Sequence, residues 1–220
     1  MFKIFSGGKD DKYKFKTQEP TTKTCPYCGV KLEKIPKRKK KCPECGDYIF
    51  VRKGKLYTEE EKDIRDWLMR VEHLGITREM FNKTREELSQ EFGAVASVND
   101  TAWRMLNSII AHEKDYQIMG QIYLSMAHIL DMEGKSTKEI MKEFHRMNLL
   151  SWKETGYIKY AQWTTCNDDH VCPVCKERAG KKFSLDELEN LIPAHEGCRC
   201  GLRPIVDIEA IRNEEIVNLD

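Results

Sequence analysis

Residues 171–175 read Val171-Cys172-Pro173-Val174-Cys175, and residues 193–200 read Pro193-Ala194-His195-Glu196-Gly197-Cys198-Arg199-Cys200. Thiolate and imidazole groups are the usual ligands of zinc, and the C-x-x-C spacing places two thiolates on one side of a turn. We therefore expect a closed Cys₃His zinc site made of Cys172, Cys175, His195 and either Cys198 or Cys200. We interpret Cys166 and His170, which precede the first pair, as a free thiol and a surface or supporting group.

Four further cysteines lie near the N-terminus, where the pattern C-P-x-C-G occurs twice. Proline fixes φ and glycine tolerates the left-handed conformation, so each pattern predicts a tight turn whose thiolates converge. Two such turns complete a closed S₄ site, which is structural rather than catalytic, with the ligands Cys25, Cys28, Cys42 and Cys45. The quartet resembles a zinc ribbon over residues 25–54, with short strands near residues 48–51. Iron is the alternative metal, because S₄ sites accept both.

The composition supports metal ligation rather than disulfide bonding. The chain has 220 residues, of which 40% are hydrophobic and 33% charged, and it has nine cysteines, an odd number. No stretch approaches the roughly 18 to 20 apolar residues of a spanning helix, and the N-terminus lacks an apolar signal region. These features predict a cytoplasmic protein without membrane association, in a compartment where disulfides are disfavoured.

The charge is unevenly distributed. Residues 1–57 contain 16 Lys and Arg against 6 Asp and Glu, whereas the remainder contains 21 against 30. We expect a flexible basic leader over residues 1–24. Six basic side chains between the two cysteine turns are candidates for phosphate contacts with DNA or RNA, namely Lys34, Lys37, Arg38, Lys39, Lys40 and Lys41. A solvated loop or a protein-docking loop is the alternative for this run.

Residues 56–158 have helical periodicity and predict an antiparallel bundle or paired hairpins. Thr58 with Glu61 forms a capping box before a first helix that stops at Gly75. A second helix is expected over residues 77–92. A third runs from about residue 99 to Gly134 with its weak point at Gly120, and Ser136 with Glu139 opens a fourth. The overall expectation is a mostly α protein with a small β-containing ribbon and a small C-terminal zinc module.

Residues 163–204 resemble the C-terminal motif of phage head-morphogenesis proteins, the Mu F-like minor head family. The resemblance covers about a fifth of the chain and rests on Trp163, Thr165, Asp169, Cys172, Cys175, Gly180, Phe183, Pro193, His195, Cys198, Arg199, Cys200 and Pro204. Glu196 stands where family members usually have proline. The resemblance implies a zinc-binding module over residues 159–206, followed by a tail over residues 207–220.

By the same resemblance, the protein is expected to be a virion-associated minor component that contacts portal or capsid proteins and DNA, without catalytic chemistry. A cytoplasmic regulator or adaptor that binds nucleic acid through the ribbon, encoded by a phage or mobile element, is the alternative. Enzyme templates fit poorly, because His195 and Glu196 lack the second histidine of H-E-x-x-H and the H-x-E order of deaminases. The remaining enzymatic alternative is a metal-dependent nuclease that uses Asp168, Asp169 and His170.

Overall fold

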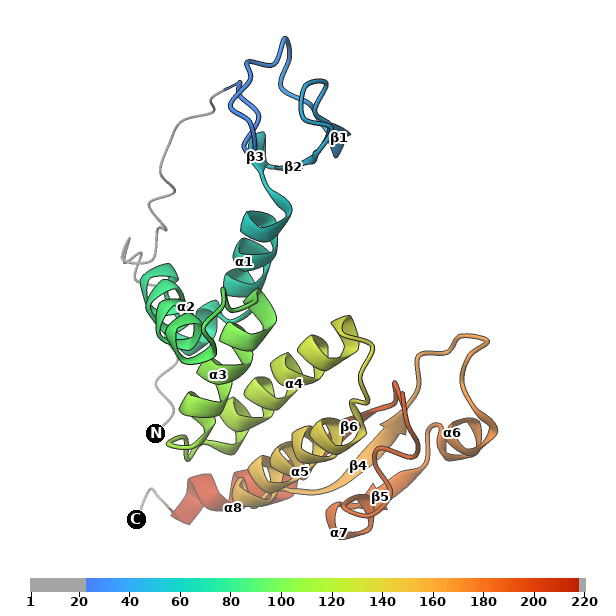
Figure 1. Ribbon diagram of the computed structural model, residues 1–220. Coiled ribbons are helices and arrows are strands. Elements are labelled where there is room, and N and C mark those ends of the chain that lie inside the picture. Colours follow the sequence, from blue (N-terminus) through green and yellow to red (C-terminus); the bar gives the residue numbers. More distant parts are fainter. Residues whose placement is uncertain (1–22, 218–220) are drawn as a thin grey trace. The chain divides into compact units, whose positions relative to one another are not determined.

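The computed structural model describes residues 23–217 and divides the chain into two compact units, one ending at Arg65 and the other starting at Asp66 (Figure 1). The expected leader over residues 1–24 lies outside the described residues, except for Lys23 and Thr24. These two residues belong to the ribbon, since Thr24 forms a β-bridge with Lys31. About 48% of the described residues are helical, which agrees with the expected mostly α class.

The first unit contains a small antiparallel sheet in the order β1-β2-β3. Its strands are β1 (Lys40–Lys41), β2 (Tyr48–Arg52) and β3 (Lys55–Tyr57). The short strands expected for the ribbon are therefore present. The buried core is formed by two of the cysteines together with aliphatic side chains, namely Cys25, Leu32, Cys42 and Ile49. A core this small buries little apolar surface, and a metal ion bound by the cysteines would supply folding free energy to the ribbon.

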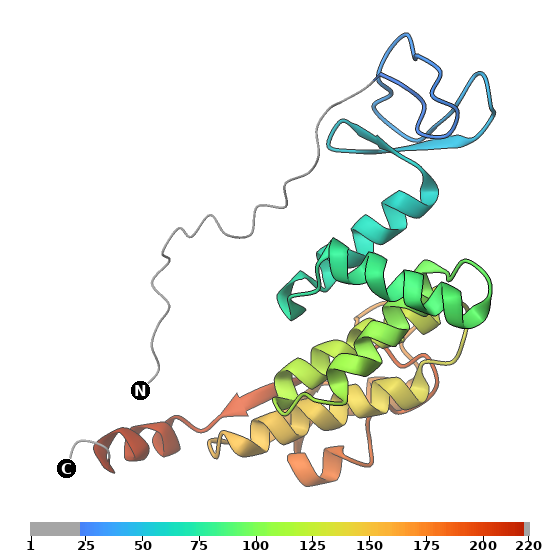
Figure 2. The same cartoon turned by 60° about the vertical axis from the view of Figure 1, so that its left-hand side comes forward.

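Helices dominate the rest of the described chain. Their bounds are α1 (Glu59–Arg70), a 3₁₀ turn (Glu72–Leu74), α2 (Arg78–Phe92), α3 (Val98–Ile110), α4 (Tyr116–Met132), α5 (Lys138–Glu154), α6 (Pro173–Arg178), α7 (Leu185–Leu188) and α8 (Ile208–Val217). Helices α4 and α5 lie side by side and are joined by a short turn at Gly134 (Figures 1 and 2). No described helix has both the length and the apolar character needed to cross a membrane.

The expected third helix is two helices, and the expected weak point at Gly120 is wrong. The break lies between α3 and α4, where the Asp115 carboxylate caps α4 by accepting hydrogen bonds from the N–H groups of Gln117 (2.7 Å) and Ile118 (3.1 Å). Gly120 lies inside α4 and is buried, and an added Cβ there would meet the Asn148 side chain at 3.1 Å. The glycine therefore permits close packing of α4 on α5 instead of ending the helix.

The start of α5 also differs from the expected capping box. Ser136 and Glu139 do not cap each other; instead, the Glu196 carboxylate accepts hydrogen bonds from Ser136 Oγ (2.8 Å) and the Thr137 N–H (3.2 Å). Thr137 itself makes no side-chain cap. An acidic group at a helix N-terminus satisfies free backbone donors and interacts favourably with the helix dipole. The residue next to His195 thus secures a helix that begins about sixty positions earlier in the chain.

The C-terminal part contains a three-stranded sheet that the periodicity did not indicate. Its order is β5-β4-β6, built from β4 (Ile158–Thr164), β5 (Lys182–Ser184) and β6 (Gly201–Val206). Alternation along β4 turns Ala161 and Trp163 inward, where both are almost fully buried. They pack in one core with side chains of α5, α6 and α7, and this core includes Cys175, Cys198 and Cys200. The expected helical domain and the expected zinc module therefore share a hydrophobic core.

The buried histidine of α5 makes the stability of the second unit sensitive to acid. His145 is only 4% exposed, and burial lowers its pKa to about 4, whereas an unfolded histidine titrates near pH 6.5. Between pH 6.5 and pH 4, His145 therefore binds a proton in the unfolded chain but stays neutral in the folded chain. The free energy of unfolding falls as the pH falls through this range. At pH 5 this cost is about 2 kcal/mol, and we expect His145→Leu to remove it.

The measurement is the free energy of unfolding of wild type and His145→Leu at pH 7 and pH 5. Because thiol protonation at the cysteine clusters affects both proteins equally, the difference between them isolates His145. His112→Leu, at an exposed histidine, is the matched control. Equal acid sensitivity of wild type and His145→Leu would show that His145 does not carry the effect.

Candidate metal centres

The two N-terminal cysteine turns have the same backbone structure. In each, the glycine has a positive φ, 74° at Gly29 and 78° at Gly46, and its N–H donates to the carbonyl of the first cysteine. These hydrogen bonds measure 2.9 Å to Cys25 and 3.1 Å to Cys42. The left-handed residue lets the chain turn sharply around the sulfur atoms, as the C-P-x-C-G pattern predicts.

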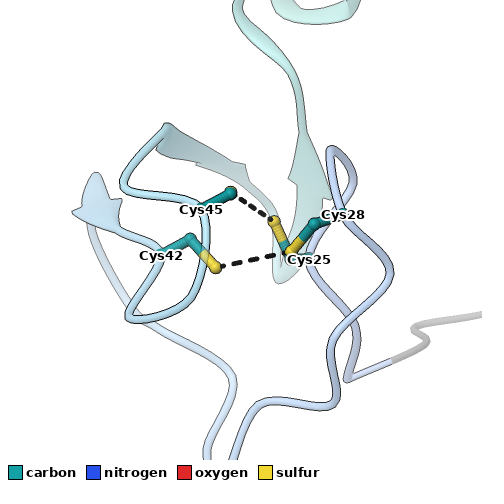
Figure 3. Close-up of side chains that lie close together, drawn as sticks. All are labelled: Cys25, Cys28, Cys42 and Cys45. Atoms are coloured by element: carbon teal, nitrogen blue, oxygen red, sulfur yellow. Dashed lines mark hydrogen bonds between the residues drawn. The ribbon is translucent and has the colours of Figure 1, made fainter.

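The two turns bring all four thiols together (Figure 3). The sulfur atoms of Cys25 and Cys45 are 3.8 Å apart, as are those of Cys28 and Cys42. This separation is far longer than the 2.05 Å of a disulfide bond. A tetrahedral zinc ion with bonds of 2.3 Å would hold its sulfur ligands about 3.8 Å apart, so the quartet fits a tetrahedral ion.

The thiols of the quartet differ in pKa. Backbone N–H groups of Cys45 and Glu44 stabilise the Cys42 thiolate and lower its pKa to about 7. At Cys45 the N–H of Asp47 acts in the same direction, but burial and the thiols of Cys42 and Cys28 raise the pKa to about 12. Four thiolates at this spacing repel one another, and a bound metal ion would remove that barrier to deprotonation.

The C-terminal cluster is built on a helix start and a loop. Cys172 is the N-cap of α6, and its sulfur accepts a hydrogen bond from the Cys175 N–H at 3.4 Å. Pro173 occupies the first turn of the helix, where a missing N–H has no cost. The other donors lie on the segment from His195 to Cys200, just before β6.

Five donors meet at this cluster, one more than a tetrahedral ion uses. They form two overlapping groups, Cys172 with Cys175 and His195, and Cys175 with Cys198 and Cys200. The Cys175 sulfur lies 3.4 Å from His195 Nε2 and 3.9 Å from the Cys198 sulfur. A zinc ion would place sulfur and nitrogen ligands about 3.6 Å apart and two sulfur ligands about 3.8 Å apart, so these pairs fit. Cys175 belongs to both groups, and Cys198 and Cys200 both lie within the cluster.

Surrounding groups orient the donors of this cluster. The carbonyl of Glu196 lies 2.7 Å from His195 Nδ1, so that nitrogen carries the proton and Nε2 is left free to face Cys175. Burial raises the pKa of Cys200, and the indole N–H of Trp163 acts against this effect. That N–H is buried without a well-formed hydrogen bond among the described residues. A thiolate at Cys200 would satisfy it, so this donor set also fits a cation.

An ion pair joins the two segments that carry the donors. Both carboxylate oxygens of Asp168 accept from Arg199, at 2.8 Å each, and Asp168 also accepts from the His170 N–H at 3.0 Å. Arg199 lowers the pKa of Asp168, as expected for such a pair. The Asp168 carboxylate proposed for a nuclease is therefore engaged in holding the loops together.

Cys166 and His170 lie beside the cluster and outside both donor groups. The Cys166 thiol donates to the Arg199 carbonyl at 3.3 Å. Both side chains line a small cavity together with four of the cluster donors, Cys172, Cys175, His195 and Cys200. Their assignment as a free thiol and a supporting group stays a prediction.

The six basic residues predicted to contact nucleic acid are all exposed in the first unit, namely Lys34, Lys37, Arg38, Lys39, Lys40 and Lys41. Two of them, Lys39 and Lys41, lie over aromatic rings of β2.

The chain gives no match when compared with protein-family models, with curated proteins or with solved structures.

Proposed function

We propose that the chain is a non-enzymatic, zinc-binding head-morphogenesis protein of the Mu F-like kind, which contacts a phage portal or capsid protein. Two structural zinc ions, one in each cysteine cluster, hold its ribbon and its C-terminal module together. The C-terminal module binds the portal or capsid protein, and the metal ions have a structural role. When bound, each ion would supply charge neutralisation for its thiolates and a cross-link between distant segments.

The observation that supports this proposal is that the motif residues act together. Trp163 on β4 packs edge-on against Phe183 on β5 with ring centroids 6.2 Å apart, and Gly180 donates its N–H to the Trp163 carbonyl. Arg199 pairs with Asp168, the neighbour of the motif's Asp169. Segments that are distant in sequence thus meet in one module, which is the arrangement expected if the motif is the family's folding unit.

The test is co-expression of the full chain with the portal protein and, separately, the major capsid protein of the same phage genome. We expect the chain to elute with one of them on size exclusion. Cys175→Ser should lose this association, whereas Cys28→Ser, in the other unit, should retain it. Absence of wild-type association with both proteins, together with specific operator binding, would replace the proposal by the nucleic-acid regulator or adaptor.

A further inference from the structure

We propose that one face of the ribbon binds single-stranded nucleic acid, with a base stacked on Tyr48 and the flanking phosphates held by Lys39 and Lys41. We call this surface the aromatic–lysine face and define it by Lys39, Lys41, Tyr48 and Phe50. It lies in the first unit and goes beyond the association of the C-terminal module with a portal or capsid protein. Its test is therefore independent of that association.

Strand register places these four side chains on one side of the β1–β2 pair. Lys41 pairs directly with Tyr48, and Lys40 pairs with Ile49, which is buried on the opposite side. Because successive residues alternate between faces, Lys39 falls opposite Phe50 and shares the side of Lys41 and Tyr48. Figure 1 shows the two strands next to each other.

The lysines are held over the rings by cation–π contacts. The Lys39 Nζ lies 4.4 Å from the Tyr48 ring centroid and 4.6 Å from that of Phe50. The Lys41 Nζ lies 5.1 Å from the Tyr48 centroid, and Lys62 of α1 covers Phe50 at 4.9 Å. Phe50 is only 8% exposed, whereas Tyr48 is 47% exposed. The half-exposed Tyr48 ring thus carries two ammonium groups, and a base stacks on it once these groups move from the ring to the flanking phosphates.

The charge around this face favours a polyanion. Over residues 23–57 the chain has eleven Lys and Arg against three Asp and Glu, a net charge of +8. Lys34, Lys37 and Arg38, which precede Lys39 in the chain, are also exposed and add to this positive charge. Phosphate neutralisation by such residues releases counterions and drives association at moderate salt.

The exposed ring favours a single strand over a duplex. Proteins without sequence preference bind single strands by combining a basic track with aromatic side chains that stack on unpaired bases. In a duplex the base faces are covered by their neighbours, so Tyr48 would have nothing to stack on and only the phosphate contacts would remain. An acidic protein segment would likewise use the lysines without needing the ring.

The experiment measures binding of the full chain to a fluorescent 20-nucleotide dT strand, to a 20-base-pair duplex and to polyglutamate over a range of salt concentrations. We expect the dT strand to bind most tightly. Lys39→Ala/Lys41→Ala should weaken dT binding about tenfold and reduce the salt slope by about 1.4, the value for two lost phosphate contacts. Tyr48→Ala should weaken it about tenfold with the slope unchanged, and Tyr48→Phe should bind as wild type.

The matched control is Lys23→Ala/Lys31→Ala, which removes the same charge from exposed positions beside the first cysteine turn. Zinc content measured on every variant verifies that the ribbon is folded. The proposal is overturned if the control weakens binding as much as Lys39→Ala/Lys41→Ala, or if Tyr48→Ala binds as wild type. Tighter binding of the duplex or of polyglutamate would overturn it in favour of a duplex or an acidic protein partner.

Discussion

Cys42→Ser is expected to release the zinc ion proposed for the ribbon and to unfold the ribbon while the second unit stays folded. Cys42 is 2% exposed and belongs both to the sulfur quartet and to the small core that it forms with Ile49. Structural zinc contributes about 10–16 kcal/mol of apparent binding free energy in small finger peptides. The described core of the ribbon is small, so loss of that ion would remove its folded state.

Native mass spectrometry of anaerobically purified protein gives the ion count, and hydrogen exchange locates the unfolding. We expect amide protection to vanish over residues 24–57 and to persist in α4 and α5. Cys166→Ser is the control, because it removes a thiol that lies outside the donor groups. Retention of two ions and of ribbon protection in Cys42→Ser would refute the assignment of a metal to this quartet.

Cys175→Ser is expected to cause the largest loss of stability in the second unit. Cys175 is 1% exposed, is common to both C-terminal donor groups and packs in the core with Trp163 and Leu188. Burial raises the pKa of its thiol, and so do the neighbouring thiols of Cys200 and Cys172, so its deprotonation depends on a bound cation. Loss of the ion and of this core contact should lower the free energy of unfolding by more than about 4 kcal/mol.

The measurement is the same ion count combined with calorimetric unfolding of wild type, Cys175→Ser and Cys166→Ser. Comparing Cys198→Ser with Cys200→Ser shows which of these thiols completes the coordination, since only a ligand should lower zinc affinity sharply. If Cys175→Ser kept both ions and unfolded as wild type does, the C-terminal cluster would be a set of buried thiols without a metal.

Features encoded within a few residues were predictable from the sequence. The C-P-x-C-G turns depend on a proline and a glycine at fixed offsets, and the cap at Thr58 depends on a hydroxyl followed by the helix start. In both cases the interacting groups are only a few residues apart in the sequence, so the sequence pattern predicts the turn or the cap. Each turn also places its own two sulfurs on one side, and repetition of the pattern predicted that the two pairs form one quartet.

Features that depend on distant partners were not predictable. Strand β4 pairs with β6 about forty residues later, as at Trp163 and Leu202, and nothing in the local pattern reveals that pairing. Apolar residues continue at helical spacing across the break at Asp115. The periodicity therefore predicted one helix where the structure has α3 and α4. The sequence spacing also does not decide whether Cys198 or Cys200 is the fourth metal ligand, because the irregular loop places both thiols in the cluster.

The hydrogen bonds from Glu196 to Ser136 and Thr137 have a consequence for the order in which the protein matures. Glu196 follows His195 directly, so a loop fixed by a metal ion also fixes the group that closes the first turn of α5. If the cluster holds an ion, a chain without it would leave that turn frayed and the α4–α5 hairpin loosened at the same end. Metal binding would then act as a checkpoint, because only the metal-loaded chain would have a complete hairpin.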